Sequence, residues 1–274
     1  REQYGTGVIA VDTPSGIHGT TGEIMGIALE ADITVTFGFA KTGLLLYPGK
    51  YYAGNLVVAD IGFPQASLLK AGWDAKLITP DDLSWLPKRQ PDGNKGTFGK
   101  VLVIAGSRGM SGAAYFSALG AYRTGAGLVK ILTVPENRQV LQTQLPEAII
   151  SCYDPDQEET MQKILEAECA WADVIVAGPG LGQEAYTEYL LETVLSDSYV
   201  PIVLDADGLN CVASHPYLTR YFTENIIITP HMGEMSRLTS VPIADLKKDP
   251  LEEARAYSAR YGAVWVLKHA VTVI

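Results

Sequence analysis

The stretch that decides the fold is VLVIAGSRG, residues 101–109, in which an unbroken apolar run leads directly into a glycine-rich polar cluster. Three later stretches repeat this arrangement: VIVAGPGLG (174–182), IVLDADGLN (202–210) and IIITPHMGE (226–234). Unbroken apolar runs are typical of strands buried on both faces, as in parallel sheets with helices on each side. Ligands bind beyond the carboxyl ends of such strands, so the four clusters predict one composite site.

The composition describes an ordinary globular protein with a net negative charge. The chain has 274 residues, of which 47% are apolar and 19% charged, and its net charge is −10. This length suffices for one large domain or two smaller ones. The negative charge argues against nucleic acid or an anionic membrane as partner, since both need clustered Lys and Arg. It leaves a nucleotide open, because backbone N–H groups alone can hold phosphate.

Cysteine usage and hydropathy predict a cytoplasmic protein. Cys152, Cys169 and Cys211 are odd in number and lack CxxC spacing, so we expect neither a disulfide framework nor a zinc site. No apolar run approaches the roughly 18 residues of a membrane span, and residues 1–4 do not open a signal peptide. We therefore expect no membrane contact.

The chain is expected to consist of two pieces and a linker. Residues 1–64 form the first piece, residues 65–94 are a linker rich in turn signals, and residues 95–274 form the second piece. In the first piece, strands are expected at 8–11, 33–37 and 56–61. Strand-forming residues lie almost at the first residue and again at Ile274, so we expect a fragment of a longer protein.

The second piece alternates strands and helices, which predicts an α/β fold with a doubly wound, mostly parallel sheet. Strands are expected near residues 101–105, 128–134, 147–152, 173–177, 201–204, 225–228 and 263–268. Helices are expected near residues 112–124, 136–143, 157–170, 184–196, 207–213 and 249–261.

Two of the four clusters are glycine-rich turns. Residues 106–114 (GSRGMSGAA) let a flat ligand approach the backbone, and Ser111 is the expected N-cap of the next helix. A helix N-terminus favours an anion such as pyrophosphate, although a tight turn without a ligand explains this one stretch equally well. Residues 178–182 (GPGLG) lack the GxGxxG spacing of a Rossmann dinucleotide site, which argues against a dehydrogenase.

The third cluster places two carboxylates at a strand end. A carboxylate buried there needs a metal, a hydroxyl or backbone donors, so Asp205, with Asn210 in the same cluster, is a candidate for the metal or phosphate side of the site. For Asp207 we prefer a structural role, in which it caps a helix starting at Gly208.

The fourth cluster and the end of the chain supply His231 and Lys268. Taken alone, His231 is explained better as an exposed residue of a helix that Thr229 caps and Pro230 begins. Beside three other clusters on one sheet edge, a ligand-facing His231 is preferred. Lys268 could hold phosphate as a point charge, but most single lysines are solvated surface.

The first piece contains one comparable feature, VDTPSG at residues 11–16. Asp12 and Ser15 follow a strand, and Pro and Gly hold them in place, so they could position a sugar hydroxyl or a monovalent cation. A plain Asp-Pro-Ser-Gly turn is the alternative.

Residues 95–274 resemble the ribokinase-like domain of the NAD(P)HX dehydratases. The matching motifs, in order, are KGTFGKVLVIAGS, MSGAA, RTGAGLV, GPGLG, VLDADGLN, TPHMGE and VLKHAVTVI. Residues 7–64 resemble the C-terminal part of the Rossmann-like α/β NAD(P)HX epimerase domain, through VIAVDTPSG, ADITVTFGFAKTGLLLYPG and GNLVVADIGFP. The two modules occur fused in this order in bifunctional NAD(P)H-hydrate repair enzymes.

The resemblance implies repair of hydrated, redox-inactive NADH and NADPH. The dehydratase (a lyase) uses ADP or ATP to remove water from (6S)-NAD(P)HX, and the epimerase (an isomerase) interconverts the R and S forms. Phosphorylation would turn the ring hydroxyl into a leaving group, with Mg²⁺ offsetting phosphate charge. The epimerase module implies K⁺, and the family often forms homo-oligomers.

The resemblance also assigns residues. Ala113, Gly182 and His231 match contacts to NAD(P)HX, and Asp12 matches such a contact in the epimerase module. Ser15 matches a K⁺ ligand. The adenine-nucleotide segment corresponds to Lys268, His269, Ala270, Val271 and Thr272.

Some features depart from the family pattern. His269 stands where the family often has Gly, and Met232 where it often has Pro. The Asp expected to act as catalytic base would lie beyond Ile274, so we expect residues 1–274 alone to complete neither reaction.

Two rival functions remain open. One is a ribokinase-fold kinase for a small alcohol such as a vitamin precursor, against which the GPGLG and TPHMGE loops and the epimerase-like block argue. The other is a non-catalytic nucleotide-binding scaffold.

Overall fold

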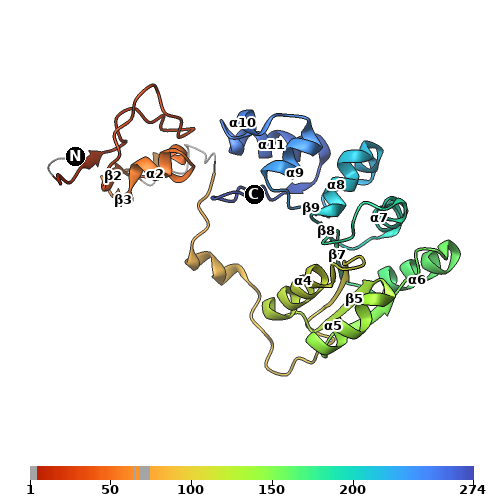
Figure 1. Ribbon diagram of the computed structural model, residues 1–274. Helices are drawn as coiled ribbons and strands as arrows, with labels where there is room; N and C mark the ends of the chain where they lie inside the picture. The colour runs from red at the N-terminus through yellow and green to blue at the C-terminus, as the bar shows by residue number, and fades with distance from the viewer. Residues whose placement is uncertain (1–4, 65, 68–74) are drawn as a thin grey trace. The chain divides into compact units, whose positions relative to one another are not determined.

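The structure, a computed structural model, describes residues 5–64, 66–67 and 75–274. The chain divides into two units, Arg1–Lys88 and Arg89–Ile274, here called unit 1 and unit 2 (Figure 1). The boundary falls within the linker expected at 65–94, of which residues 65 and 68–74 lie outside the described part. That stretch also contains the short 3₁₀ helix η1 (Pro80–Trp85).

Unit 1 contains a three-stranded parallel sheet. Its strands β1 (Ile9–Val11), β2 (Ile33–Phe37) and β3 (Asn55–Ala59) lie in the order β1-β2-β3. The helices α1 (Thr42–Leu45) and α2 (Gly49–Ala53) follow β2, and a small core of Ile17, Leu44 and Ala53 forms beside them. β1 carries Ile9 and Val11 with 68% of their surface exposed, so this sheet has one largely uncovered face.

Unit 2 contains a seven-stranded sheet in which every pair of neighbouring strands is parallel, in the order β10-β9-β8-β7-β4-β5-β6. The strands are β4 (Lys100–Ile104), β5 (Leu128–Thr133), β6 (Ile149–Cys152), β7 (Val174–Ala177), β8 (Ile202–Leu204), β9 (Ile226–Ile228) and β10 (Val264–Trp265). The helices are α4 (Ser111–Thr124), α5 (Arg138–Gln144), α6 (Glu158–Trp171), α7 (Ala185–Asp197), α8 (Asp207–Ser214), α9 (Met232–Thr239), α10 (Ile243–Leu246) and α11 (Pro250–Tyr261). This confirms the predicted α/β fold.

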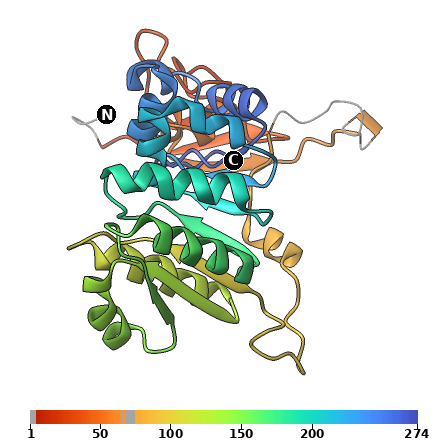
Figure 2. The same ribbon diagram turned by 90° about the vertical axis from the view of Figure 1, so that its right-hand side faces the viewer.

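The order of the strands reverses at β4. From β4 the chain adds β5 and β6 on one side, then returns through α6 to place β7 on the other side. One core cluster unites Val103, Val129 and Ile131 of the sheet with Ala114 of α4 and Leu141 of α5. Helices lie on both faces of this sheet (Figures 1 and 2). The pair β4 and β7 is therefore the topological switch point, where ligands bind in open α/β sheets.

The last part of the sheet differs from the expectation. The strand expected at 263–268 ends at Trp265, because the chain then turns: Leu267 pairs with Val273 in an isolated antiparallel bridge. Lys268 instead forms a parallel bridge with His231. Helices α9 and α10 also lie outside the expected helical stretches. No helix in the described ranges has the length and apolar character needed to cross a membrane.

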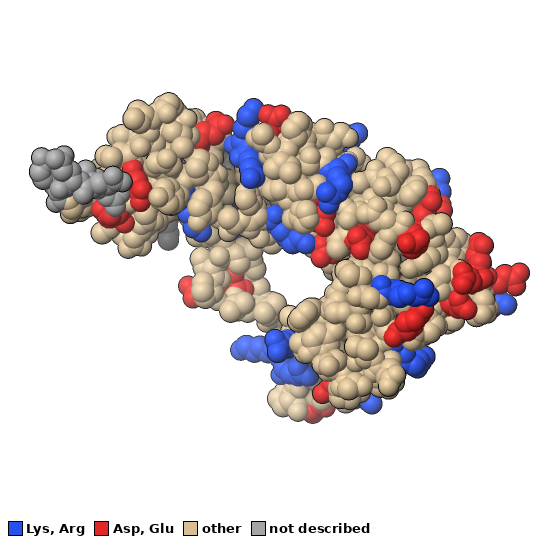
Figure 3. Space-filling model, in the orientation of Figure 1, with Lys and Arg blue, Asp and Glu red and all other residues tan. Residues whose placement is uncertain are grey.

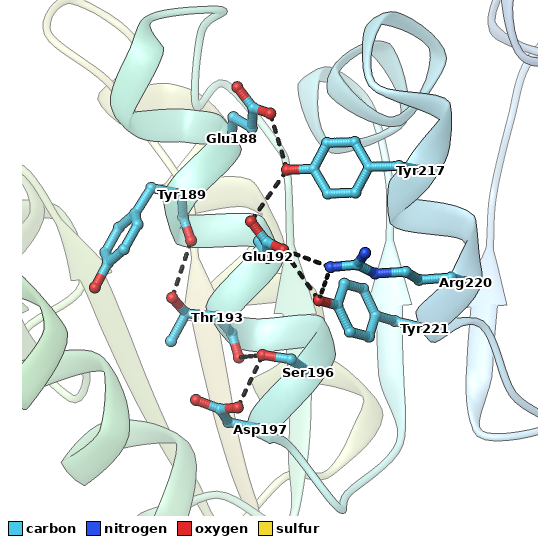
Figure 4. Close-up of polar contacts among 9 residues, drawn as sticks. All are labelled: Glu188, Tyr189, Glu192, Thr193, Ser196, Asp197, Tyr217, Arg220 and Tyr221. Carbon is cyan, nitrogen blue, oxygen red and sulfur yellow. Dashed lines mark hydrogen bonds and ion pairs between the residues drawn. The ribbon is translucent and has the colours of Figure 1, made fainter.

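Helix α7 is held against the 3₁₀ helix η3 (Pro216–Tyr221) by a polar network (Figure 4). The Tyr217 hydroxyl lies 2.8 Å from Glu188 Oε1 and 3.0 Å from Glu192 Oε2. Arg220 and the Tyr221 hydroxyl each donate to Glu192 Oε1 at 3.0 Å. The bond to Glu188 raises the pKa of Tyr217 above its usual range, because ionisation would add a third negative charge here.

The charged side chains on the surface contribute little to the stability of the fold. On the face drawn in Figure 3, acidic and basic side chains are interspersed over unit 2. The exposed pair Arg108–Glu136, at 2.6 Å, is an example. Exposed ion pairs contribute about 0–1 kcal/mol each, so the buried sheet core carries most of the stability.

Candidate functional site

Five neighbouring strands end at the same edge of the sheet in unit 2. In the order β10-β9-β8-β7-β4, they are followed by the segments that contain Lys268, His231, Asp205, Gly182 and Ala113. The structure therefore brings the four sequence clusters and the Lys268 segment together on one edge, at and beside the switch point.

The two glycine-rich loops are bonded to each other through their backbones. The Gly106 N–H donates to the Pro179 carbonyl at 2.9 Å, and the Ser107 N–H donates to the Gly180 carbonyl at 2.6 Å. The first loop is also held from below by Asn137, which is 3% exposed and donates Nδ2–H to the carbonyls of Gly106 and Ser107 at 3.2 and 3.0 Å. Asn137 was missed by the sequence reasoning, since an Asn after a strand carries no motif of its own.

Glycine is required at two points of the second loop. At Gly178, with φ +121°, a Cβ would lie 1.9 Å from the Asp205 carbonyl oxygen. At Gly180, with φ +65°, a Cβ would lie 2.7 Å from Cβ of Ala113. These close approaches place the loop directly against the start of α4 and the end of β8. Ala113 and the Gly182 loop are thus side by side.

Two of the expected helix caps are wrong. Ser111 is the first residue of α4 and Met110 precedes it as the cap, so the Ser111 side chain is not the N-cap. Asp207 is likewise the first residue of α8, preceded by Ala206 at φ +51°. Instead of capping α8, the Asp207 carboxylate accepts a hydrogen bond from the Gly182 N–H at 3.0 Å.

His231 is the N-cap of α9, a role that the less favoured interpretation gave to Thr229. Its Nδ1 accepts hydrogen bonds from the N–H groups of Gly233 and Glu234, at 2.9 and 3.3 Å. Glu234 closes a capping box by accepting from the His231 N–H at 2.8 Å. Because Nδ1 accepts, this geometry assigns the neutral imidazole with its proton on Nε2. The side chain is 54% exposed, and its Nε2 lies 3.4 Å from Glu234 Oε1.

Lys268 follows β10 and contacts the segments that follow β9 and β8. Its N–H donates to the Pro230 carbonyl at 2.7 Å, and its Nζ lies 2.6 Å from Asp205 Oδ1. His269, Ala270, Val271 and Thr272 complete a turn that the Leu267–Val273 bridge closes. The turn therefore presents a partly exposed cation, which is paired with the partly exposed Asp205 carboxylate of the segment after β8.

Asn210, expected on the metal or phosphate side, is engaged within the protein. Its Oδ1 accepts from Arg237 Nε at 2.8 Å, and its Nδ2 donates to Asp207 Oδ1 at 3.3 Å. The Asn210 oxygen is therefore committed to Arg237, whereas the Asp205 carboxylate is paired with the partly exposed Lys268 side chain.

In unit 1, Asp12 forms a polar cluster at the end of β1. Asp12 has φ +67°, in the left-handed region that Asp tolerates. Its Oδ1 accepts from Lys41 Nζ, from the Phe37 N–H at 3.1 Å and from Thr36 Oγ1 at 3.2 Å. The bond from Lys41 lowers the pKa of Asp12, and the Phe37 N–H lowers it further. This cluster is more than the plain turn left open by the sequence.

Two residues expected to hold cations, Asp205 and Ser15, offer oxygen atoms to a ligand. In the described ranges, no three His, Cys, Asp or Glu side chains gather as a metal site. Mg²⁺ is usually held by one or two carboxylates together with substrate phosphates, and Asp205 fits that smaller requirement. Ser15 is exposed in the loop after β1 and offers a hydroxyl oxygen, while its carbonyl accepts from the Leu29 N–H at 3.1 Å.

Family comparisons agree with this architecture. Residues 101–274 match the NAD(P)H-hydrate dehydratase family, and residues 2–43 match the YjeF-related protein N-terminus family. A bifunctional NAD(P)H-hydrate repair enzyme from Thermofilum pendens is 36% identical over 98% of this chain and 52% of its own length. The chain thus spans about half the length of the curated relatives it matches.

Solved structures agree as well. A ribokinase-like superfamily protein from Enterococcus faecalis is 28% identical, with a TM-score of 0.61, over 71% of this chain and 66% of its own. An ADP/ATP-dependent NAD(P)H-hydrate dehydratase from Bacillus subtilis, co-crystallised with ATP and Mg²⁺, is 31% identical, with a TM-score of 0.56, over 68% of this chain and 64% of its own. The family match, the site at the switch point and these neighbours together show that the chain belongs to the ribokinase-like NAD(P)H-hydrate dehydratase family through residues 101–274. Its residues 2–43 are a YjeF-related segment.

Proposed function

We propose that the full-length protein repairs hydrated nicotinamide nucleotides. Unit 2 would contribute to ADP- or ATP-dependent dehydration of (6S)-NAD(P)HX to NAD(P)H, and unit 1 to epimerisation of the R and S forms. The observation that carries this proposal is the row of segments from Ala113 to Lys268 on five neighbouring strands. It gives a small-residue surface for one nucleotide beside a cationic turn for another.

The two ends of the row suit two different ligands. The Ala113 and Gly182 segments present backbone and methyl groups, which allow a flat ring to approach closely. His231 would add a neutral Nε2–H donor to an oxygen of the hydrated ring or its phosphates. At the other end, residues 268–272 would bind the adenine nucleotide, with Lys268 facing phosphate. The phosphoryl donor and the ring hydroxyl would then meet near Asp205.

The chemistry requires activation of a poor leaving group. Transfer of the terminal phosphoryl group to the ring hydroxyl forms a phosphate ester, and the hydroxyl proton goes to a base. The lone pair of the ring nitrogen then expels the phosphate, and the resulting iminium ion loses a proton from the adjacent ring carbon to a base, which restores the dihydronicotinamide. Asp205 would hold Mg²⁺ together with the nucleotide phosphates, and the ion would offset the charge that develops during transfer. Lys268 would move from Asp205 to phosphate as the nucleotide binds.

The same proposal includes the remaining expectations. Asp12 would contact NAD(P)HX in the epimerase module, and Ser15 would contribute to a K⁺ site. We also infer a cytoplasmic location and a homo-oligomeric state, to which the 71% exposed Phe116 on α4 could contribute.

An oxygen-isotope experiment tests the proposed chemistry. Hydrated NADH carrying ¹⁸O in the ring hydroxyl would be incubated with the full-length protein, Mg²⁺ and ADP or ATP. The proposal predicts recovery of NADH with the ¹⁸O in inorganic phosphate. Release of the label as water would contradict phosphorylation of the hydroxyl. Nucleotide-dependent phosphorylation of a vitamin-precursor alcohol, without recovery of NADH, would favour the small-alcohol kinase.

A further inference from the structure

Three side chains connect the second glycine-rich loop to α9. The Gly182 N–H donates to Asp207 Oδ2 at 3.0 Å. Asn210 Nδ2–H donates to Asp207 Oδ1 at 3.3 Å, and Arg237 Nε–H donates to Asn210 Oδ1 at 2.8 Å. We call the hydrogen-bonded series Arg237–Asn210–Asp207 the Asp207 relay. It runs from the last turn of α9, across the first turn of α8, to the loop after β7.

The donors and acceptors of the Asp207 relay have a fixed direction. A guanidinium can only donate, so Asn210 must turn its oxygen toward Arg237. The amide nitrogen of Asn210 then faces Asp207. An ionised carboxylate only accepts, so Asp207 can receive both this N–H and that of Gly182. The orientation of each group depends on that of the previous one. Replacing the Asp207 carboxylate by an amide, or the Asn210 amide by a carboxylate, therefore breaks the series.

The relay adds a side-chain contact at the end of a glycine-rich loop that the buried Leu181 side chain and its backbone bonds to the first loop already hold. Residues 178–182 are mostly glycine, and Gly182 has φ +75°. Such a segment loses much conformational entropy when it is ordered. The Asp207 carboxylate holds the Gly182 N–H, and α9, which provides Arg237, also carries His231 at its N-terminus. One series of bonds thus links two positions on the proposed dinucleotide side.

We propose that Asp207, Asn210 and Arg237 are positioning residues that hold Gly182 and α9 in the geometry for dinucleotide binding. This inference rests on the proposed function. It assigns Asn210 to the dinucleotide side of the site instead of the metal or phosphate side, and Asp207 to the loop instead of a helix cap.

The polarity of the relay provides its own test. In Asp207→Asn, the new amide can satisfy either Gly182 or Asn210, but not both, unless Asn210 turns a donor toward Arg237. In Asn210→Asp, two carboxylates face each other. The double variant Asp207→Asn/Asn210→Asp restores every bond, because the new amide accepts from Gly182 and donates to the new carboxylate, which accepts from Arg237. Asp245→Asn, on the exposed surface of α10, is the matched charge control.

Steady-state kinetics of the full-length protein distinguish the roles. Asp207→Asn and Asn210→Asp should each raise the KM for hydrated NADH about five- to tenfold, as expected for loss of one hydrogen bond. The control Asp245→Asn should leave this KM unchanged. The double variant should return within about threefold of wild type, because coupled residues are not additive. The KM for ADP or ATP should stay at the wild-type value in the two single relay variants, the double variant and the control. A double variant no better than the worse single one, or a change confined to the nucleotide KM, would overturn the proposal.

Amide hydrogen exchange at Gly182, measured by NMR without ligands, separates the relay from the enzyme activity. The amide should exchange slowly in wild type and in the double variant, and faster in both single variants. Equal exchange in all of them would refute the relay whatever the activity. If the variants show the expected exchange pattern but the wild-type protein cannot restore NADH, the proposed function is refuted and the relay is not.

Discussion

Lys268 Nζ lies 2.6 Å from Asp205 Oδ1, which joins the turn after β10 to the end of β8 across the intervening strand β9. Both groups are partly exposed, at 40% and 30% of their side-chain surface. In the proposed function, Lys268 would exchange this partner for phosphate, and Asp205 would hold the metal ion beside that phosphate. The residue proposed to bind phosphate and the residue proposed to hold the metal ion are therefore in direct contact.

The first prediction concerns these two residues. Lys268→Ala should weaken binding of ADP or ATP about 10- to 100-fold, the loss expected for a charge-assisted hydrogen bond. Asp205→Asn should tighten nucleotide binding without Mg²⁺, because a competing negative charge is gone, and should reduce the gain on adding Mg²⁺. Calorimetric titrations with and without Mg²⁺ measure both effects. An Asp205→Asn protein with the Mg²⁺ response of wild type would contradict the role of Asp205.

The second prediction separates the two roles of His231. His231→Asn keeps an N-cap of a favoured type, whereas His231→Ala loses the cap at a cost of about 1 kcal/mol in the free energy of unfolding. Urea denaturation should therefore show only the Ala variant destabilised. Both variants should show a raised KM for hydrated NADH, since both lack the Nε2–H donor. If the Asn variant keeps the wild-type KM, His231 acts as a cap alone.

The third prediction concerns the close approach at Gly178. Gly178→Ala would place a Cβ against the Asp205 carbonyl, so the backbone of one loop must move, and we expect a loss of about 3 kcal/mol in stability. Gly109→Ala is the matched control, because it also has positive φ (+81°) but nothing lies within 4 Å of its Cβ. It should lose only about 1 kcal/mol, from backbone strain. Equal losses in urea denaturation would show that the contact with Asp205 is not tight.

The fourth prediction concerns pH. Because Lys41 lowers the pKa of Asp12 in the folded state, the unfolded chain binds a proton more readily. The stabilisation is thus present above the ordinary pKa of 3.8 and is lost as the pH falls through the lower folded value. An NMR titration of the Asp12 carboxyl carbon should give a midpoint below 3.8, and Lys41→Met should raise it. Lys50→Met serves as the charge control. A midpoint that Lys41→Met leaves unchanged would contradict this cause.

The sequence was sufficient for the sheet and for the edge where the site lies. Apolar runs such as residues 174–177 have one simple structural solution, a buried parallel strand, and the glycine clusters after them mark the strand ends. The order of the strands was not predictable, because neighbouring runs look alike and only packing decides which pair. The switch point between β4 and β7 therefore came from the structure.

The bonds within the site were harder to predict. Helix starts shifted by one or two residues at Ser111, Asp207 and His231, and such a shift converts an expected cap into a different contact. Asp207 is an example. If α8 began one residue later, the Asp207 carboxylate would cap its own helix, whereas in the structure it accepts from the Gly182 N–H. The Asp205–Lys268 pair joins residues 63 positions apart in the chain, a separation at which local sequence patterns carry no information.

A dehydration assay of the full-length protein and its Lys268→Ala variant tests the proposed repair of nicotinamide nucleotides. Each would receive hydrated NADH, Mg²⁺ and either ADP or ATP, and the return of the dihydronicotinamide absorbance would be followed. We expect recovery of NADH by wild type with at least one donor, consumption of that donor in equal amount, and a raised KM for the donor in the variant. A folded wild-type protein that binds nucleotide but restores no NADH with either donor would contradict it.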